Sequence, residues 1–434
     1  MMAHAIVGPG FVLDDWFLVR NATFDGALGV VGPDLRAARP GSLLTYVLVF
    51  GIDPRSPWAS LIAQGAIFLC AVVLVQLVLQ RVLGPRLAMA ITTLWVLLPS
   101  HLSVETWPSA VVATASLVLL AGGVLVLLQR PTHPVWLGLA CLLLAASCLT
   151  YEASIVPASA AFVLAPWWTA GRLQWRTIAA GAATLGAVAL WQVLNWHSVK
   201  SVQRDLAAYD QVLQAHFGWG IVSYGWVASC FLVIGLAGVV TAAVRLTFPS
   251  FRGLGGYPER LVIGGAAVVV AGSISFSLYF YAPVGAGDRV NYVSSIGGAA
   301  VWVGIAWMLQ RFWRPLGLLL LVALVAAGVW TRWDRTALWA TAKSDADRIL
   351  EEVQRTDPAC DVVTLGPAPI QRQNVAAFLD QSNVDAAVQI ALGRREVAGV
   401  ITFSEAQFLK APAECRVDIR PLSKLEPDVV VAPT

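Results

Sequence analysis

Two adjacent carboxylates near the start of the chain are the residues whose type and spacing best suit chemistry. Asp14 and Asp15 stand between the apolar flanks of the stretch Phe11–Phe17. In a poorly hydrated crevice two neighbouring negative charges repel, so one of them holds its proton more tightly than the other. Such a carboxylate is a candidate general base for a sugar or lipid hydroxyl. The alternative is that one Asp caps a helix at Trp16–Thr23 while its neighbour is solvated.

A second pair of candidate residues follows Pro99. His101 and Glu105 are four residues apart, so on a helix they would share one face. They could orient a substrate as an imidazole–carboxylate pair, make a plain hydrogen bond at the membrane interface, or bind a metal. Two ligands alone do not define a zinc site. The sequence leaves the need for a divalent cation undecided.

The loop Gly285–Tyr292 is a candidate phosphate site. Its glycines allow close backbone approach, and Arg289 is the one cation within it. A planar guanidinium pairs with phosphate through two parallel hydrogen bonds, so Arg289 could hold the phosphate head of a lipid carrier. The alternative is that Asp288 and Arg289 form a turn bonded to its own neighbours.

Two further loops carry charged residues. Glu152 stands between two apolar runs, and a charge at membrane depth costs about 2.5–3.5 kcal/mol unless it has a partner or a water-lined cavity. At the very surface it would need neither. Lys200 and Arg204 are one helical turn apart in the loop Trp196–Phe217. They could bind a carrier phosphate, or simply the anionic headgroups of the membrane.

The elements that must position these residues are membrane helices. Hydrophobic residues make up 58% of the chain and charged residues 13%, against about 25% charged in a soluble domain, and the mean hydropathy is +0.70. Apolar runs of spanning or near-spanning length recur along the chain. The ten runs are Trp58–Val82, Leu87–Leu98, Pro108–Leu128, Pro134–Thr150, Ala153–Trp168, Thr177–Trp196, Gly218–Val244, Leu261–Ala282, Tyr292–Leu309 and Pro315–Trp330.

Charge in the loops sets the orientation of these runs. Suppose residues 1–57 lie outside. Of the Lys and Arg in the short loops between the runs, ten then fall inside and three outside, as the positive-inside rule requires. Joining Pro134–Trp168 into one helix would leave six inside and seven outside, so we predict a break at Tyr151–Glu152. Of the eleven acidic residues among the first 331, only Glu259 is then inside. The ten outside are Asp14, Asp15, Asp25, Asp34, Asp53, Glu105, Glu152, Asp205, Asp210 and Asp288.

Residues 332–434 differ sharply from the apolar part, with twelve Lys and Arg and fifteen Asp and Glu. We predict a small α/β domain on the outer face, after an outer segment 1–57 and a helical bundle 58–331. Asp334–Arg355 has the pattern of an amphipathic helix with Leu338, Ala342, Ile349 and Val353 on one stripe. Asp361–Leu365 and Gly399–Phe403 are predicted strands, and Asn374–Leu392 two short helices broken near Gln381–Asn383.

Cys360 and Cys415 are the two cysteines of this tail. In an oxidising compartment they could pair and close a loop of about 55 residues, which the chain-entropy model values at about 4 kcal/mol. The alternative is two buried thiols. Cys70, Cys141, Cys148 and Cys230 lie in apolar runs, where a free thiol behaves as a small hydrophobe.

With these residues in place, the chain resembles the GT-C superfamily of polytopic membrane glycosyltransferases, which take sugars from polyprenyl-phosphate carriers. The resemblance covers roughly the first 310 residues and is one of layout. The matching stretches are Asp14-Asp15-Trp16, Arg39-Pro40 before a short amphipathic helix (Leu43–Phe50), Gly51–Pro54, Pro99–Trp107, Tyr151-Glu152 with Pro157, and Asp288–Tyr292.

The resemblance implies roles for particular residues. The first outer loop of that family supplies the acid that activates the acceptor, which here means Asp14 or Asp15. Later outer loops supply basic groups for the carrier phosphate, which implicates Arg289, with Lys200 as a second candidate. His101, Glu105, Glu152, Asp288 and Tyr292 complete the candidate contacts to substrate or carrier. The family also has a helix before the acid pair, and Met1–Leu13 is too short to span, so either this end crosses without its own helix or a first helix is missing.

The sequence therefore predicts an α-helical polytopic protein of the cytoplasmic membrane with a C-terminal extracytoplasmic domain. Its predicted function is transfer of a sugar from a polyprenyl-phosphate carrier to a hydroxyl of a glycan, lipid or protein on the outer face. One alternative is a transporter or flippase for a lipid-linked saccharide. The polar residues inside the runs are mainly Gln64, Gln76, Gln192 and Asn195, which disfavours transport of ions or large polar cargo. The other alternative is a non-catalytic scaffold of an envelope-assembly complex.

Overall fold

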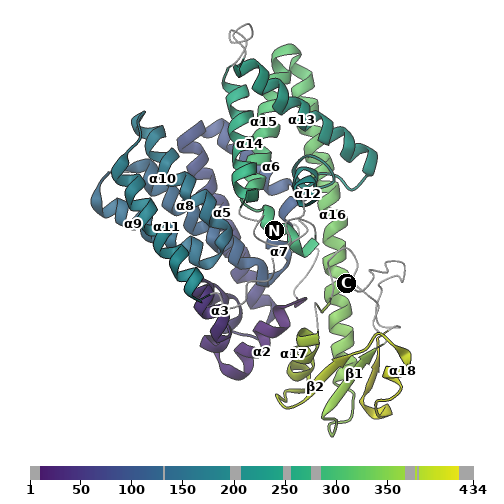
Figure 1. The fold of residues 1–434 in the computed structure, drawn as a ribbon. Helices are drawn as coiled ribbons and strands as arrows, with labels where there is room; N and C mark the ends of the chain where they lie inside the picture. The colour runs from purple at the N-terminus through teal and green to yellow at the C-terminus, as the bar shows by residue number, and fades with distance from the viewer. Residues whose placement is uncertain are drawn as a thin grey trace.

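The computed structural model describes residues 10–130, 132–195, 207–247, 256–274, 285–366, 377–378 and 381–419. Figure 1 shows a bundle of long helices above a small lobe of helices and strands, with α16 running from one to the other. The predicted interface helix around Lys200 and Arg204 lies outside the described residues.

Each of the ten predicted apolar runs overlaps a helix, and residues 275–282 of the run Leu261–Ala282 lie outside the described residues. Six helices are long and apolar enough to cross a membrane, counted over the described residues, so the chain is a multi-pass membrane protein. The ten helices are α5 (Pro57–Leu83), α6 (Pro85–Leu97), α8 (Val111–Gln129), α9 (Pro134–Thr150), α10 (Ile155–Ala170), α11 (Trp175–Asn195), α13 (Gly225–Thr247), α14 (Tyr257–Ile274), α15 (Ser294–Phe312) and α16 (Arg314–Val353).

The predicted break at Tyr151–Glu152 is confirmed. Helix α9 ends at Thr150, Tyr151 has an extended backbone (φ −153°, ψ 116°), and a short 3₁₀ turn, η5 (Glu152–Ser154), leads into α10. Hydrogen bonds fix the turn against α8, because the Ser116 hydroxyl bonds to both Ser147 and Ser154. Two separate helices therefore stand where one long helix could have been.

Small residues let neighbouring helices of the bundle pack closely. A Cβ added at Gly265 of α14 would lie 2.7 Å from the Gly297 carbonyl oxygen of α15, and one added at Gly297 would lie 2.5 Å from the Gly265 carbonyl oxygen. Close backbone approach of this kind is a common source of stability between membrane helices. This packing holds α15 against α14, and the first turn of α15 carries Ser294 and Ser295, which contact His216 and His101.

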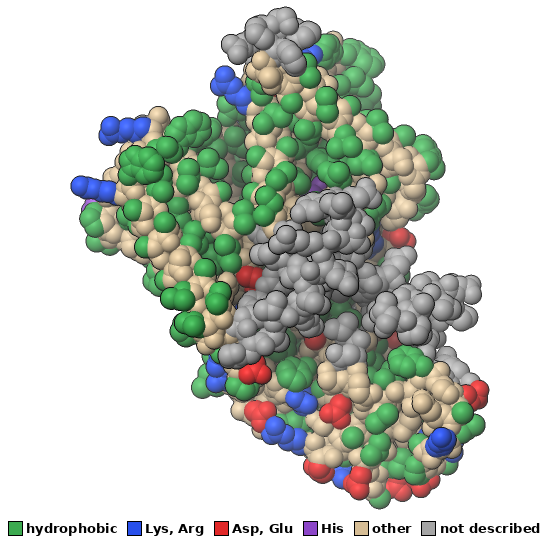
Figure 2. Space-filling view, viewed as in Figure 1, with side chains coloured by type: hydrophobic (Ala, Val, Ile, Leu, Met, Phe, Trp, Pro, Cys, Tyr) green, Lys and Arg blue, Asp and Glu red, His purple; other side chains and the backbone are tan. Residues whose placement is uncertain are grey.

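Charged side chains gather toward the two ends of the bundle. On the face drawn in Figure 2, Lys and Arg stand out at the upper helix ends, apolar side chains dominate between, and Asp and Glu concentrate toward the lower end. This distribution fits a bundle that crosses an apolar layer.

The N-terminal segment folds over the lower end of the bundle. It contains α2 (Asp15–Asp25), η1 (Ala27–Gly29), α3 (Pro33–Ala38), α4 (Pro40–Tyr46) and the π-helical turn η2 (Val47–Gly51). Helix α4 and η2 replace the predicted amphipathic helix Leu43–Phe50. Leu44 and Leu48 are exposed whereas Tyr46 and Phe50 are buried, so the predicted two-faced character is confirmed.

The last membrane helix and the predicted helix Asp334–Arg355 are one continuous helix, which corrects the expectation of two. Helix α16 has 40 residues, and at 1.5 Å per residue it is about 60 Å long, twice the apolar thickness of a bilayer. The predicted boundary at residue 331 therefore falls inside a helix. No glycine or proline interrupts residues 329–353, so the backbone has no reason to break there.

The C-terminal domain holds a three-stranded parallel sheet in the order β2-β1-β3. The strands are β1 (Val362–Gly366), β2 (Ala398–Ile401) and β3 (Arg416–Asp418), and α17 (Gln381–Leu392) and α18 (Glu405–Phe408) connect them. The first two strands were predicted, but β3 was not. The second of the two predicted helices in Asn374–Leu392 is α17, and residues 374–376 and 379–380 of the first lie outside the described residues. Cys360 and Cys415 form the predicted disulfide, with Cα atoms 5.8 Å apart.

Short elements lie between the long helices. They are η3 (Pro99–His101), α7 (Ser103–Thr106), η4 (Pro108–Ala110), α12 (Ala207–Phe217) and η7 (Gly285–Asn291). In the C-terminal domain, η8 (Ala413–Cys415) precedes β3.

Candidate active site

The acid pair sits on a constrained turn. Leu13 is buried and has a φ of +54°, and it is the one non-glycine residue with positive φ in the described part of the chain. Asp14 follows with φ −79° and ψ 0°, and α2 begins at Asp15. Such conformations cost free energy and concentrate at functional sites. The Leu13 amide donates to the Ala377 carbonyl (3.0 Å), so the C-terminal domain helps to hold this turn.

Asp15 is fully enclosed, with 0% of its side chain exposed. One carboxylate oxygen accepts from the Ser109 amide (2.8 Å) and from the Ser109 hydroxyl, and the other accepts from the Val12 amide (3.0 Å). Burial, with a smaller contribution from Asp14, raises the pKa of Asp15 from 3.8 to about 7. Asp15 therefore ties the N-terminal turn to the start of α8, and both of its oxygens are engaged in doing so.

Asp14 differs from its neighbour because its side chain is only half-buried. Its side chain makes no capping hydrogen bond to α2, so the helix-cap alternative does not describe it. After burial itself, the charge of Asp14 is the largest influence that raises the pKa of Tyr46. The Tyr46 hydroxyl donates to the Ser109 carbonyl (3.2 Å). Asp14 therefore lies near the Tyr46–Ser109–Asp15 chain of contacts, and its side chain is partly exposed.

Lys343 completes the site and was missed in the sequence. It stands on α16 roughly 20 Å beyond Trp330, the end of the apolar run, and is 3% exposed. Its aliphatic chain packs on Gly10, where an added Cβ would lie 3.0 Å from the Lys343 Cδ. Burial lowers the pKa of Lys343 to about 8, and the Asp15 charge opposes that shift. The one sequence feature that indicated burial of Lys343 was its position next to Ala342, which belongs to the apolar stripe of the predicted amphipathic helix.

Arg289 reaches the same region from η7. Its guanidinium lies over the Trp107 ring, 4.6 Å from the centroid, and hydrogen-bonds the Tyr151 side chain. It is also within electrostatic reach of Tyr46. The Arg289 guanidinium is half-buried against the Trp107 ring, and this arrangement suits pairing with a phosphate.

Glu152 has the partner that its burial requires. Its carboxylate forms an ion pair with Arg39, the residue just before α4, and the Arg39 guanidinium stacks over Tyr151 at 5.5 Å. Tyr151 thus stands between Arg39 and Arg289. The structure brings Asp14, Asp15, Glu152 and Arg289 around the two tyrosines Tyr46 and Tyr151.

His101 and Glu105 bond to different partners. Glu105 forms a buried ion pair with Arg332 of α16, which also donates to the Val96 carbonyl (2.7 Å). His101 is fully buried, stacks on Trp95 at 5.5 Å and contacts the Ser295 hydroxyl through Nδ1 (3.2 Å). No imidazole–carboxylate pair forms between them.

Asp288 and Tyr292 lie beside His101 and the short helix α7. Asp288 accepts from the Ser103 amide (2.9 Å), and burial raises its pKa to about 6. Tyr292 is buried against His101, with ring centroids 5.3 Å apart. The loop Gly285–Tyr292 is therefore bonded to α7 through Asp288, and not only to its own neighbours. Within the described residues no three His, Cys, Asp or Glu side chains come together as metal ligands would.

Comparisons with known proteins give a limited result. No family model and no curated protein matches the sequence. Among solved structures, ArnT from Cupriavidus metallidurans bound to undecaprenyl phosphate is 13% identical with a TM-score of 0.48, over 98% of this chain and 89% of that chain. Apo ArnT is 14% identical with a TM-score of 0.42, over 92% and 83%.

A third similar structure is the archaeal oligosaccharyltransferase AglB from Archaeoglobus fulgidus, in complex with an inhibitory peptide and a dolichol-phosphate. It is 12% identical with a TM-score of 0.42, over 90% of this chain and 61% of that chain. The TM-scores of these structures lie below 0.5, so the site and function of this chain follow from its own residues.

Proposed function

We propose that this protein is a membrane glycosyltransferase that moves a sugar from a polyprenyl-phosphate carrier to an acceptor hydroxyl on the outer face of the cytoplasmic membrane. One observation carries the proposal. The carboxylate of Asp14 and the guanidinium of Arg289 are both half-buried, and both lie within electrostatic reach of Tyr46. This cluster stands at the end of the bundle where the acidic loops lie. A base and an anion-binding group are what such a transfer requires.

Asp14 is the better candidate for the base. Both oxygens of Asp15 are bonded to the protein and its side chain is sealed from solvent, so an acceptor hydroxyl cannot reach it without breaking those bonds. Asp14, in contrast, is partly exposed. Asp15 and the strained turn at Leu13 then fix the direction in which Asp14 points, and Asp15 is a positioning residue.

The reaction balances with these groups. Asp14 takes the proton of the acceptor hydroxyl, whose oxygen forms a bond to the anomeric carbon through an oxocarbenium-like state. The bond from that carbon to the carrier phosphate breaks, and the phosphate leaves with the electron pair. Arg289, and the Lys343 charge nearby, stabilise the negative charge that develops. A single displacement inverts the anomeric centre.

The transfer assay tests the role of Asp14. The protein in nanodiscs is given undecaprenyl-phosphate-linked sugars and acceptor lipids, and release of undecaprenyl phosphate is followed. Asp14→Asn should lower turnover by about 10²–10⁴-fold, the usual contribution of a general base. Asp53→Asn, the same change on an exposed outer loop, should leave turnover unchanged. Wild-type turnover in Asp14→Asn contradicts the proposal.

Carrier binding tests the role of Arg289. Undecaprenyl phosphate should quench the tryptophan fluorescence of the protein, because Trp107 lies under the guanidinium. Arg289→Gln should weaken this binding by about tenfold or more, the effect of losing a charged hydrogen bond. Arg55→Gln, on an exposed outer loop, is the matched control. Equal affinities for the two variants would remove Arg289 from the site.

A further inference from the structure

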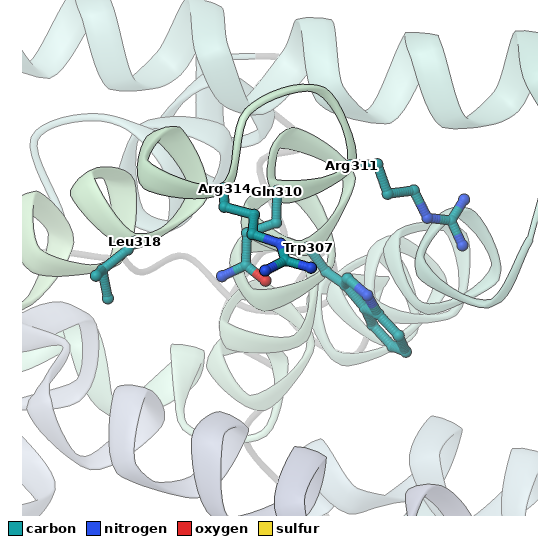
Figure 3. A pocket seen from close by; sticks show the side chains of 5 residues that line it. All are labelled: Trp307, Gln310, Arg311, Arg314 and Leu318. Carbon is teal, nitrogen blue, oxygen red and sulfur yellow. The ribbon is translucent and has the colours of Figure 1, made fainter.

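A pocket lies at the opposite end of the bundle from the acid pair. It is lined by Trp307, Gln310 and Arg311 of α15, and by Arg314 and Leu318 of α16. Figure 3 shows Gln310 and Arg314 close together in the middle of the view, with Trp307 next to them, Leu318 at the left and Arg311 at the right. The lining of the pocket therefore combines two cationic side chains with a polar and two apolar ones.

The charge of this pocket is not cancelled by the protein. Arg311 shares Glu259 with Arg245, so two guanidinium groups compete for one carboxylate. Arg314 has no acidic partner among the residues that the structure describes. As the first residue of α16, Arg314 also stands at the positive end of that helix dipole. The pocket therefore presents excess positive charge to a ligand.

The depth of the pocket matches the headgroup region of a bilayer. Phe312 and Trp313 are exposed beside it, as aromatic residues of the membrane interface are. Leu318 and Leu319 are exposed one turn further along α16, toward the apolar part of the bundle. A ligand that places an anionic group at Arg314 would lay its apolar part along these leucines.

We propose that this pocket binds an anionic phospholipid of the cytosolic leaflet, with its phosphate on Arg314 and Gln310 and an acyl chain on Leu318. Basic pockets between membrane helices on this side are suited to such headgroups. The Trp307 ring forms the wall, held by Tyr257 at a ring-centroid distance of 5.7 Å. The site is independent of the proposed glycosyl transfer, since its residues lie at the other end of the bundle.

Lipid binding to the full chain in detergent micelles tests this site. Spin-labelled phosphatidylglycerol should bind more tightly than spin-labelled phosphatidylcholine, and Arg314→Gln should reduce that preference by about five- to tenfold. Arg172→Gln is the matched control, because Arg172 is exposed at the same predicted side in the turn between α10 and α11. It should keep the wild-type preference, and Arg314→Lys should keep part of it.

Three results would overturn the proposal. Equal loss of preference in the Arg314 and Arg172 variants would show only general attraction to a basic surface. An unchanged preference in Arg314→Gln would place the lipid elsewhere. Displacement of the labelled lipid by millimolar inorganic phosphate alone would identify a soluble anion as the ligand.

Discussion

A fully buried carboxylate stands at each end of the bundle, and the two are held in opposite ways. Glu259, at the predicted cytosolic end, accepts from Arg245 (3.2 Å), Arg311 (3.3 Å) and the Gly256 amide (2.8 Å). Asp15, at the other end, accepts from the neutral donors of Ser109 and Val12. Both side chains are 0% exposed.

Under the proposed function, this difference separates a structural charge from a functional one. Glu259 is neutralised by two cations that are partly in water, which fixes the ends of α13, α14 and α15 together. Asp15 is placed beside a second carboxylate, so its pKa rises to about 7, chiefly by burial. A protein gains no stability from gathering like charges. Under the proposed function, the closeness of Asp15 to Asp14 serves the chemistry of Asp14, while the hydrogen bonds of Asp15 hold the turn.

The largest expected effect on stability comes from a third buried carboxylate, Glu105. It lies at the same end as Asp15 but forms an ion pair with Arg332. Arg332→Met would leave Glu105 buried without its cation, at a cost of about 3–5 kcal/mol. The double variant Arg332→Met/Glu105→Gln should recover much of the loss, because no charge is then stranded. Unfolding by SDS in mixed micelles measures both. Equal stability of the single and double variants would show that water solvates the Glu105 carboxylate once Arg332 is removed.

Glu259→Gln should cost less, about 1–3 kcal/mol, because the two arginines it releases are partly exposed. Its transfer rate per folded molecule should stay at the wild-type value. The same SDS titration, combined with the transfer assay on the folded fraction, checks this. A variant that folds normally but loses transfer would place Glu259 in the reaction and remove the contrast between the two ends.

Stability should also depend on pH through the outer pair. The folded protein raises the pKa of Asp15 from 3.8 to about 7, so it binds more protons than the unfolded chain in that range and loses stability as pH rises through it. Lys343, whose pKa falls from 10.5 to about 8, adds stability as pH rises above about 8. Thermal unfolding should therefore show a shallow minimum between about pH 7 and 8. Asp15→Asn should abolish the acid limb, and an unchanged profile would contradict the assignment.

The smallest effect is expected where the C-terminal domain meets α2. Arg395 and Asp25 form an exposed ion pair across this contact (2.6 Å), which should contribute less than about 1 kcal/mol. Arg395→Ala tests it by the same SDS titration. Trp16 is the contrasting residue, because it is buried, bonds to the Ala377 carbonyl (3.2 Å) and packs on Phe378. If Arg395→Ala destabilises as much as Trp16→Ala, charge and not apolar packing holds the domain in place.

The sequence predicted the helices well because apolar runs of membrane length leave few other structures. It also predicted the break at Tyr151, from charge balance, and the disulfide, from two cysteines in a polar tail. It could not separate Asp14 from Asp15, since their difference arises from Ser109, which is 94 residues away in the chain. The same holds for the Glu105–Arg332 pair, which is 227 residues apart and replaced the expected pairing with His101.

Lys343 shows a different limit of the sequence. A lysine in a polar, charge-rich tail gives no sign that it will be buried, and only the continuity of α16 carries it to the acid pair. The change in hydropathy predicts a domain boundary at residue 331, yet a helix can leave the membrane without a break when no glycine or proline interrupts it.

The role of the acid pair is best tested by comparing the transfer rates of Asp14→Asn and Glu259→Gln, each normalised to folded protein. We predict a loss of at least about 100-fold for Asp14→Asn and a wild-type rate for Glu259→Gln. Equal rates in the two variants, whether both high or both low, would show that the acid pair at the outer end has no special part in the chemistry.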